Sequence, residues 1–218
     1  MSWFQLDPQS IASRARAARS PVPSLGASLV RGMFGFTIVS VAGFVPWAVF
    51  GKWFHIHMGK NGEVGMYAAC AVVFLALTSP LLHRLIIGPG SVSRFYKLFS
   101  ISFTAYSIAW IAGWMALRGH PGSIAGLLAG TMLMACMLVA AFDALRSVVK
   151  VFFALFLLNA IGYFVGGISE AAIIKQYPLY KVYAMLSWGV FYGLGLGAGL
   201  GLAFHFCQQR ARKLLAGG

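Results

Sequence analysis

Six long apolar stretches, separated by short polar junctions, dominate the pattern of this chain. They cover residues 29–50, 64–87, 95–117, 124–142, 148–167 and 182–206. An α-helix needs about 20 apolar residues to cross the hydrocarbon core of a bilayer, and each stretch approaches or exceeds that length. The pattern predicts an all-α, polytopic membrane protein with six transmembrane helices in one bundle.

Composition also indicates a membrane protein, and this affects how the high net positive charge is interpreted. Of the 218 residues, 60% are hydrophobic and only 10% are charged, whereas about 25% are charged in soluble domains. A net charge of +13 often indicates a nucleic-acid partner. Here the bases lie in the junctions between spans, where they set orientation and meet anionic lipid head groups. We therefore expect membrane lipids, and no nucleic acid, as partners.

The 17 Lys and Arg residues are distributed unevenly between the two sides of the predicted bundle. The richer side carries Arg14, Arg16, Arg19, Arg31, Arg84, Arg94, Lys97, Arg146, Lys150, Arg210, Arg212 and Lys213. The poorer side carries Lys52, Lys60, Arg118, Lys175 and Lys181. The positive-inside rule assigns the richer side to the cytoplasm. This predicts a bacterial inner-membrane protein with both termini in the cytoplasm.

The junctions are too short to fold alone, so we expect no separate soluble domain. The predicted parts are a basic N-terminal interfacial segment (1–28), the bundle (29–206) and a short basic tail (207–218). In the first part, Asp7 is suited to cap a short helix that begins at Pro8. Trp3 and Phe4 would then anchor among head groups. The alternative is a disordered basic tail.

Glycine spacing is the strongest local signal, and it lies in the sixth stretch. One row consists of Gly189, Gly193, Gly197 and Gly201, and a second row of Gly195 and Gly199. Glycine at every fourth position makes a flat strip that allows helix backbones to approach closely within lipid. Each row is therefore interpreted as a packing face within the bundle, as an interface between chains, or as the lining of a pore.

Polar side chains inside the predicted spans are few, although such groups often mark function. Asn159 is the strongly polar residue that lies deep in a span, and Tyr163 follows on the same face. We expect an interhelical hydrogen bond there, with a ligand contact as the alternative. The spans lack a central acid or base, and this disfavours ion-coupled transport.

Asp143 lies at the cytoplasmic end of the fourth predicted span. Helical spacing would pair its carboxylate with Arg146, and neighbouring junctions offer Arg84 and Arg94. We expect a structural ion pair, with a gating or coupling carboxylate as the alternative.

Histidines and the two remaining acids suggest weak candidates for metal and cofactor sites. The outer side carries His55, His57, His120, Glu63 and Glu170, which could bind a divalent metal if the hairpins converge. His55 and His57 would point the same way only in an extended segment. His83 and His205 lie near cytoplasmic span ends, where imidazoles could ligate haem or a chlorophyll-type pigment. The alternative for the outer histidines is an aromatic belt at the membrane surface with Trp47, Trp53 and Trp114. For His83 and His205 it is interfacial hydrogen bonding, so the cofactors stay unknown.

No complete catalytic or nucleotide-binding motif is present, so an enzyme is disfavoured. We expect a non-catalytic subunit or scaffold of a larger membrane assembly, associating with other membrane subunits or with itself. The alternative is an oligomeric small-solute channel or facilitative transporter. A water-accessible path lined by Asn159, Tyr163 and the sixth span would favour the channel. A glycine face open to lipid would favour the subunit.

Overall fold

The computed structural model describes residues 4–217, and this part of the chain is helical, without a β-strand. Short 3-10 turns, η1 to η4, join several of the helices. The helices are α1 (Pro8–Ala17), α2 (Leu25–Met58), α3 (Gly62–Leu82), α4 (Ser91–Leu117), α5 (Gly119–Ala141), α6 (Val148–Gln176), α7 (Lys181–Cys207) and α8 (Gln209–Ala216). The predicted all-α class is confirmed.

Five stretches are long and apolar enough to cross a membrane. The first, Leu25–Leu85, contains both α2 and α3, which run in opposite directions around η1 (Gly59–Asn61). α2 is longer than the apolar stretch that predicts it, because the polar segment after Phe50 continues the helix as far as Met58. Gly59 ends it with a φ of 53°, a backbone conformation that glycine adopts without strain.

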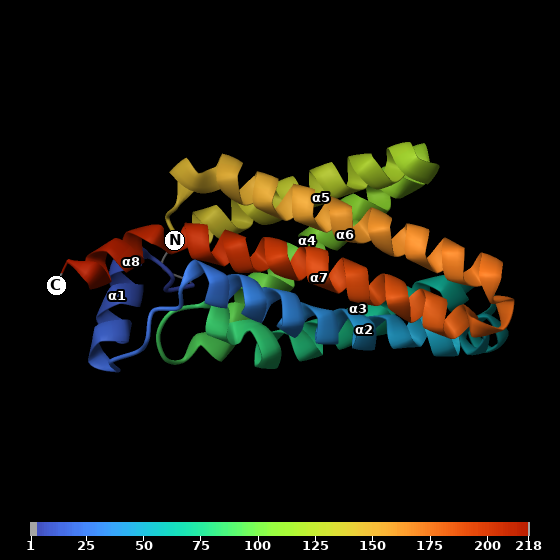
Figure 1. The fold of residues 1–218 in the computed structure, drawn as a ribbon, viewed down its shortest axis with the longest axis horizontal. Helices are drawn as coiled ribbons and strands as arrows, with labels where there is room; N and C mark the ends of the chain where they lie inside the picture. Colours follow the sequence, from blue (N-terminus) through green and yellow to red (C-terminus); the bar gives the residue numbers. More distant parts are fainter. Residues whose placement is uncertain (1–3, 218) are drawn as a thin grey trace.

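Contacts between neighbouring helices connect the six long helices into a closed ring, and Figure 1 shows this bundle from the side. In spatial order they are α3, α2, α7, α6, α5 and α4, and contact between α4 and α3 closes the ring. Helix α7 lies between α2 and α6 and is antiparallel to both, and α4 and α5 form a tight hairpin. The two terminal helices, α1 and α8, lie together at one end of the bundle.

The two glycine rows of α7 face two different helices of the same chain. In the first row, a Cβ added to Gly193 would lie 2.5 Å from the Cα of Thr37 on α2, and one added to Gly197 would lie 2.9 Å from the Cβ of Phe36. Gly189 and Gly201 meet α2 in the same way. In the second row, Gly195 and Gly199 meet α6. Side chains other than hydrogen would therefore separate α7 from both neighbours.

Aromatic side chains fill the centre of the ring. Phe95, Phe99, Phe103 and Tyr106 stack along the inner face of α4, with successive ring centroids 5.5, 5.1 and 5.8 Å apart. Phe36 of α2 is fully buried, and its ring lies 6.2 Å from those of both Phe99 and Tyr192. The bundle interior is a packed aromatic core.

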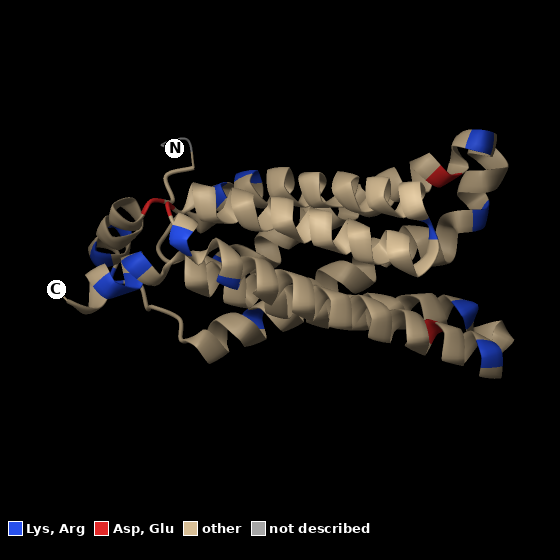
Figure 2. Ribbon diagram, turned by 90° about the horizontal axis from the view of Figure 1, so that it is seen from above, with Lys and Arg blue, Asp and Glu red and all other residues tan. Residues whose placement is uncertain are grey.

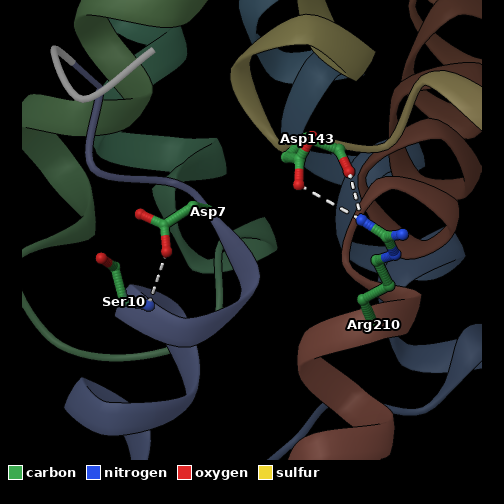
Figure 3. Close-up of polar contacts among 4 residues, drawn as sticks. All are labelled: Asp7, Ser10, Asp143 and Arg210. Carbon is green, nitrogen blue, oxygen red and sulfur yellow. Dashed lines mark hydrogen bonds and ion pairs between the residues drawn. The ribbon is translucent and has the colours of Figure 1, made fainter.

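Helix α1 is docked onto the bundle, so the disordered alternative does not apply to this helix. The Asp7 carboxylate accepts a hydrogen bond of 2.9 Å from the Ser10 amide (Figure 3), and Pro8 opens the helix as predicted. Hydrogen bonding from the Ser10 side chain, and then from the Ser10 amide, lowers the pKa of Asp7 below its ordinary value, so the cap is charged near neutral pH. The helix buries Ile11, Ala12 and Ala15.

Backbone carbonyls and one amide side chain tie the terminal segments together. Arg16 donates to the carbonyl of Leu214 in α8. The Gln208 amide donates to the Leu85 carbonyl at 2.8 Å and accepts from the Ile87 amide at 2.8 Å. Phe4 packs against the buried cluster rather than standing free as an anchor, and Trp3 lies outside the described residues.

Replacing Gly197 with Leu should lower the stability of the purified chain, because the new side chain must displace the backbone of α2. We expect a cost of about 2 kcal/mol or more, measured as a lower midpoint of thermal unfolding in detergent. Gly167→Leu is the matched control, since nothing lies within 4 Å of a Cβ at Gly167 on α6. Equal losses in both variants would contradict the packing role.

Candidate functional site

The polar groups at the centre of the bundle come from three helices. Asn159 of α6 is fully buried, and its Nδ2 donates to the Tyr106 hydroxyl of α4 at 2.9 Å. The Tyr192 hydroxyl of α7 lies 3.4 Å from that of Tyr106, a long contact. Asn159 occupies this position because it falls on the inward face of α6, in register with Leu155 and Gly162.

One atom of this cluster has no partner. The Asn159 Oδ1 is buried and accepts no hydrogen bond. An unpaired buried acceptor costs free energy, because water would otherwise solvate it. The amide therefore links α6 to α4 through its nitrogen while its oxygen stays free to accept a donor.

Tyr163 belongs to a second polar contact and does not join Asn159. Its hydroxyl lies 3.2 Å from the Ser123 hydroxyl of α5. Its backbone carbonyl accepts a hydrogen bond of 2.9 Å from the Trp188 indole of α7. Asn159 and Tyr163 share a face of α6, but they lie one turn apart and meet different helices. Asn159 bonds to Tyr106 of α4, whereas Tyr163 contacts Ser123 of α5 and Trp188 of α7.

These central groups are hydroxyls and an amide, which hydrogen-bond without carrying charge at neutral pH. They can link helices or bind a small neutral molecule. The sequence singles out Asn159 but misses Tyr106 and Tyr192. Tyr106 continues the inward register of Phe95, Phe99 and Phe103 along α4, so that periodicity is the signal that could have found it.

The outer histidines and acids do not converge. Among residues 4–217, no group of three or more His, Cys, Asp or Glu side chains could hold a metal ion. His55 and His57 both lie in α2, and helical residues two apart point in divergent directions, so the extended geometry that the metal hypothesis required is absent. Glu63 lies in the first turn of α3, and Glu170 lies in α6.

Aromatic neighbours account for two of the outer imidazoles. The His57 ring stacks on Trp53 at 4.5 Å, and its Nδ1 lies 2.9 Å from the Trp53 carbonyl. The His120 ring lies 6.2 Å from that of Phe164. Aromatic contacts of this kind agree with the alternative to metal binding, in which the histidines lie among aromatic side chains.

The two histidines considered for cofactor ligation have separate surroundings. The Nδ1 of His83, in η2 (His83–Leu85), lies 2.8 Å from the Ser91 hydroxyl. His205, in α7, packs edge-on against Phe206, and its Nδ1 is buried without a hydrogen-bond partner. These contacts do not make the two imidazoles a facing pair.

Asp143 pairs with Arg210 of α8 rather than with Arg146, Arg84 or Arg94. The two atoms Asp143 Oδ2 and Arg210 Nη1 lie 3.2 Å apart (Figure 3). Helix α5 ends at Ala141 and Asp143 has a φ of 51°, so the helical spacing that favoured Arg146 does not apply. Both side chains are mostly exposed, and such a pair contributes at most about 1 kcal/mol.

Two adjoining hollows lie around this ion pair, and Asp143, Arg210 and Lys213 line both. The first has a volume of about 340 Å³ and also contacts Arg146, Ser147 and Phe206. The second has a volume of about 500 Å³ and includes Asp7. They lie at the end of the bundle that carries α1 and α8.

Comparisons of the chain with protein-family models, with curated proteins and with solved structures find no match. A functional assignment therefore rests on the geometry described above.

A double-mutant cycle should detect the bond between Tyr106 and Asn159. Tyr106→Phe alone leaves the whole amide unpaired and should cost about 1 kcal/mol or more. Adding Asn159→Leu should cost less than the sum of the single changes, with a coupling of about 1 kcal/mol. Unfolding in detergent measures all four proteins. Tyr192→Phe is the control and should cost less, and additive losses would contradict the bond.

Proposed function

We propose that this chain is a non-catalytic inner-membrane protein that acts as a subunit or scaffold of a larger membrane assembly. In this proposal α2 to α7 are six spans, and both termini lie in the cytoplasm. The filled interior of the ring carries the proposal. A bundle whose centre is packed with side chains presents only its outer surface and its two ends to other molecules.

The burial of the central groups supports a structural rather than a transport role. Phe36 and Asn159 are fully buried, and Tyr106 is 4% exposed. A solute that crossed through the ring would have to displace these side chains and break the bond between Asn159 and Tyr106. Close packing of this kind makes the interior rigid, which suits a scaffold.

The distribution of charge supports the orientation. Lys and Arg gather at the end that carries α1 and α8 (Figure 2). Arg14, Arg16, Arg210 and Arg212 all lie in these two helices. Under the positive-inside rule, this end faces the cytoplasm.

The glycine rows of α7 are already occupied by α2 and α6. Contact with another subunit would therefore use outward side chains or the bundle ends, and the role of the rows is to hold the subunit itself together. Neither row of α7 is therefore the glycine face open to lipid that would have favoured the subunit, and the proposal rests on the filled interior instead.

Gentle extraction from the native membrane tests the subunit proposal. We expect mass spectrometry of the intact particle to find at least one other polypeptide in fixed ratio to this chain. A parallel absorption spectrum would detect any bound pigment or haem. A colourless particle that contains only this chain would contradict assembly with other subunits.

A small-solute channel is the second candidate, and one observation favours it. The unpartnered Asn159 Oδ1 is an acceptor that a passing neutral solute could use. The packed interior leads us to expect no flux of glycerol or urea into proteoliposomes above that of protein-free liposomes. Flux that the wild-type chain supports and Asn159→Leu alters, with Gly167→Leu as the unaffected control, would establish the channel instead.

A further inference from the structure

The smaller hollow beside the Asp143–Arg210 pair has the form of a ligand site. It lies where the segment after α5 meets α8, and its volume is about 340 Å³. Small-molecule sites have volumes of about 300–1,000 Å³. Two separate parts of the chain form its walls, residues 143–147 and residues 206–213.

The charges around this hollow do not balance. Arg146, Arg210 and Lys213 supply three cations, and Asp143 supplies one carboxylate. The carboxylate is bound to Arg210. Arg146 and Lys213 are exposed, and no side-chain partner is found for either within the described chain. The larger hollow, in contrast, has Asp7 and Asp143 against Arg210 and Lys213, so the excess positive charge belongs to the smaller one.

Apolar side chains accompany these cations. Leu145 is 64% exposed beside Arg146, and Phe206 lines the same hollow from the end of α7. The hollow also lies at the ends of α5 and α7, where long apolar helices give way to polar chain. A site that joins cations to apolar side chains at this level suits a molecule with an anionic head and an apolar tail.

We propose that this hollow binds the head group of an anionic phospholipid, with Arg146 and Lys213 contacting its phosphate. Arginine forms paired hydrogen bonds to phosphate oxygens, and lysine adds a compact charge. The Ser147 hydroxyl supplies a further donor, and Leu145 and Phe206 supply apolar contacts to the lipid tail. This inference goes beyond the proposed function. It requires a membrane surface at this end of the protein, and it holds whether or not a partner subunit exists.

Lipid retention by the full chain tests the proposal. The purified protein is mixed with equal amounts of phosphatidylglycerol and phosphatidylcholine in detergent, and native mass spectrometry counts the lipids that stay bound. We expect the wild type to retain phosphatidylglycerol in preference. At roughly fivefold for each base, Arg146→Gln with Lys213→Gln should lower that retention by roughly tenfold or more.

The matched control is Arg31→Gln with Arg84→Gln, which removes the same charge from exposed bases at the same end but outside the hollow. It should retain phosphatidylglycerol as the wild type does. Ser147→Trp fills the hollow without changing its charge and should also lower retention. Thermal unfolding confirms that each variant is folded.

Several outcomes would overturn the site. Equal losses in the two double variants would mean that diffuse charge, rather than this hollow, attracts the lipid. Equal retention of both lipids by the wild type would exclude anionic selectivity. Displacement of the lipid by excess inorganic phosphate, but not by chloride at the same ionic strength, would identify a free-anion site. A co-purified acidic peptide that cross-links to Lys213 and competes with lipid would identify a protein occupant.

Discussion

Backbone contact along α7 is the constraint on which the rest of this bundle depends. Lipid supplies no hydrophobic force to press helices together, so association requires many close contacts between atoms. The Gly189–Gly201 row brings α7 against α2, and Gly195 and Gly199 bring it against α6. Because α7 is shared by both contacts, it fixes the spacing of three neighbouring helices. The inward faces of α2 and α6 then meet those of α4 and α3 across the ring.

The short distances between α7 and its two neighbours limit the width of the bundle interior, and this width determines which side chains fit there. Aromatic rings from α2, α4 and α7 occupy the centre of this ring of helices and pack against one another. The few polar groups must then find partners within the bundle, as Asn159 does with Tyr106. The close approach of α7 to its neighbours and the burial of Asn159 and Tyr106 are therefore two features of the same packing.

The sequence predicts well what depends on local periodicity. Long apolar stretches correspond to long helices, the Asp7–Pro8 pair begins α1, and glycines recur on α7 at the spacing of a helix face. It predicts poorly what depends on contacts between distant segments. The partner of Asp143 lies in α8 because the chain turns after Ala141, and no spacing rule contains that turn. Tyr106 is an ordinary inward aromatic in the sequence, and only the fold brings Asn159 of α6 and Tyr192 of α7 to its hydroxyl. For His55 and His57 the sequence suggests a metal pair that the structure does not contain. Both residues lie in α2, where side chains two positions apart point in different directions.

The two ends of the molecule differ in the amount of positive charge that they carry. At one end, α1 and α8 pack against each other, and several of their arginines donate to backbone carbonyls, such as Arg16 to Leu214 and Arg212 to Pro23. A carbonyl accepts a hydrogen bond from a guanidinium but leaves its charge unbalanced, and Nε and Nη2 of Arg212 are buried without a hydrogen-bond partner. Among residues 4–217, Asp7 and Asp143 are the side-chain carboxylates at that end. Mobile ions or an anionic surface outside the chain supply the remaining counter-charge, and the lipid site proposed above would be one such source. The arginines that hold the terminal helices in place therefore also give that end of the protein its excess positive charge.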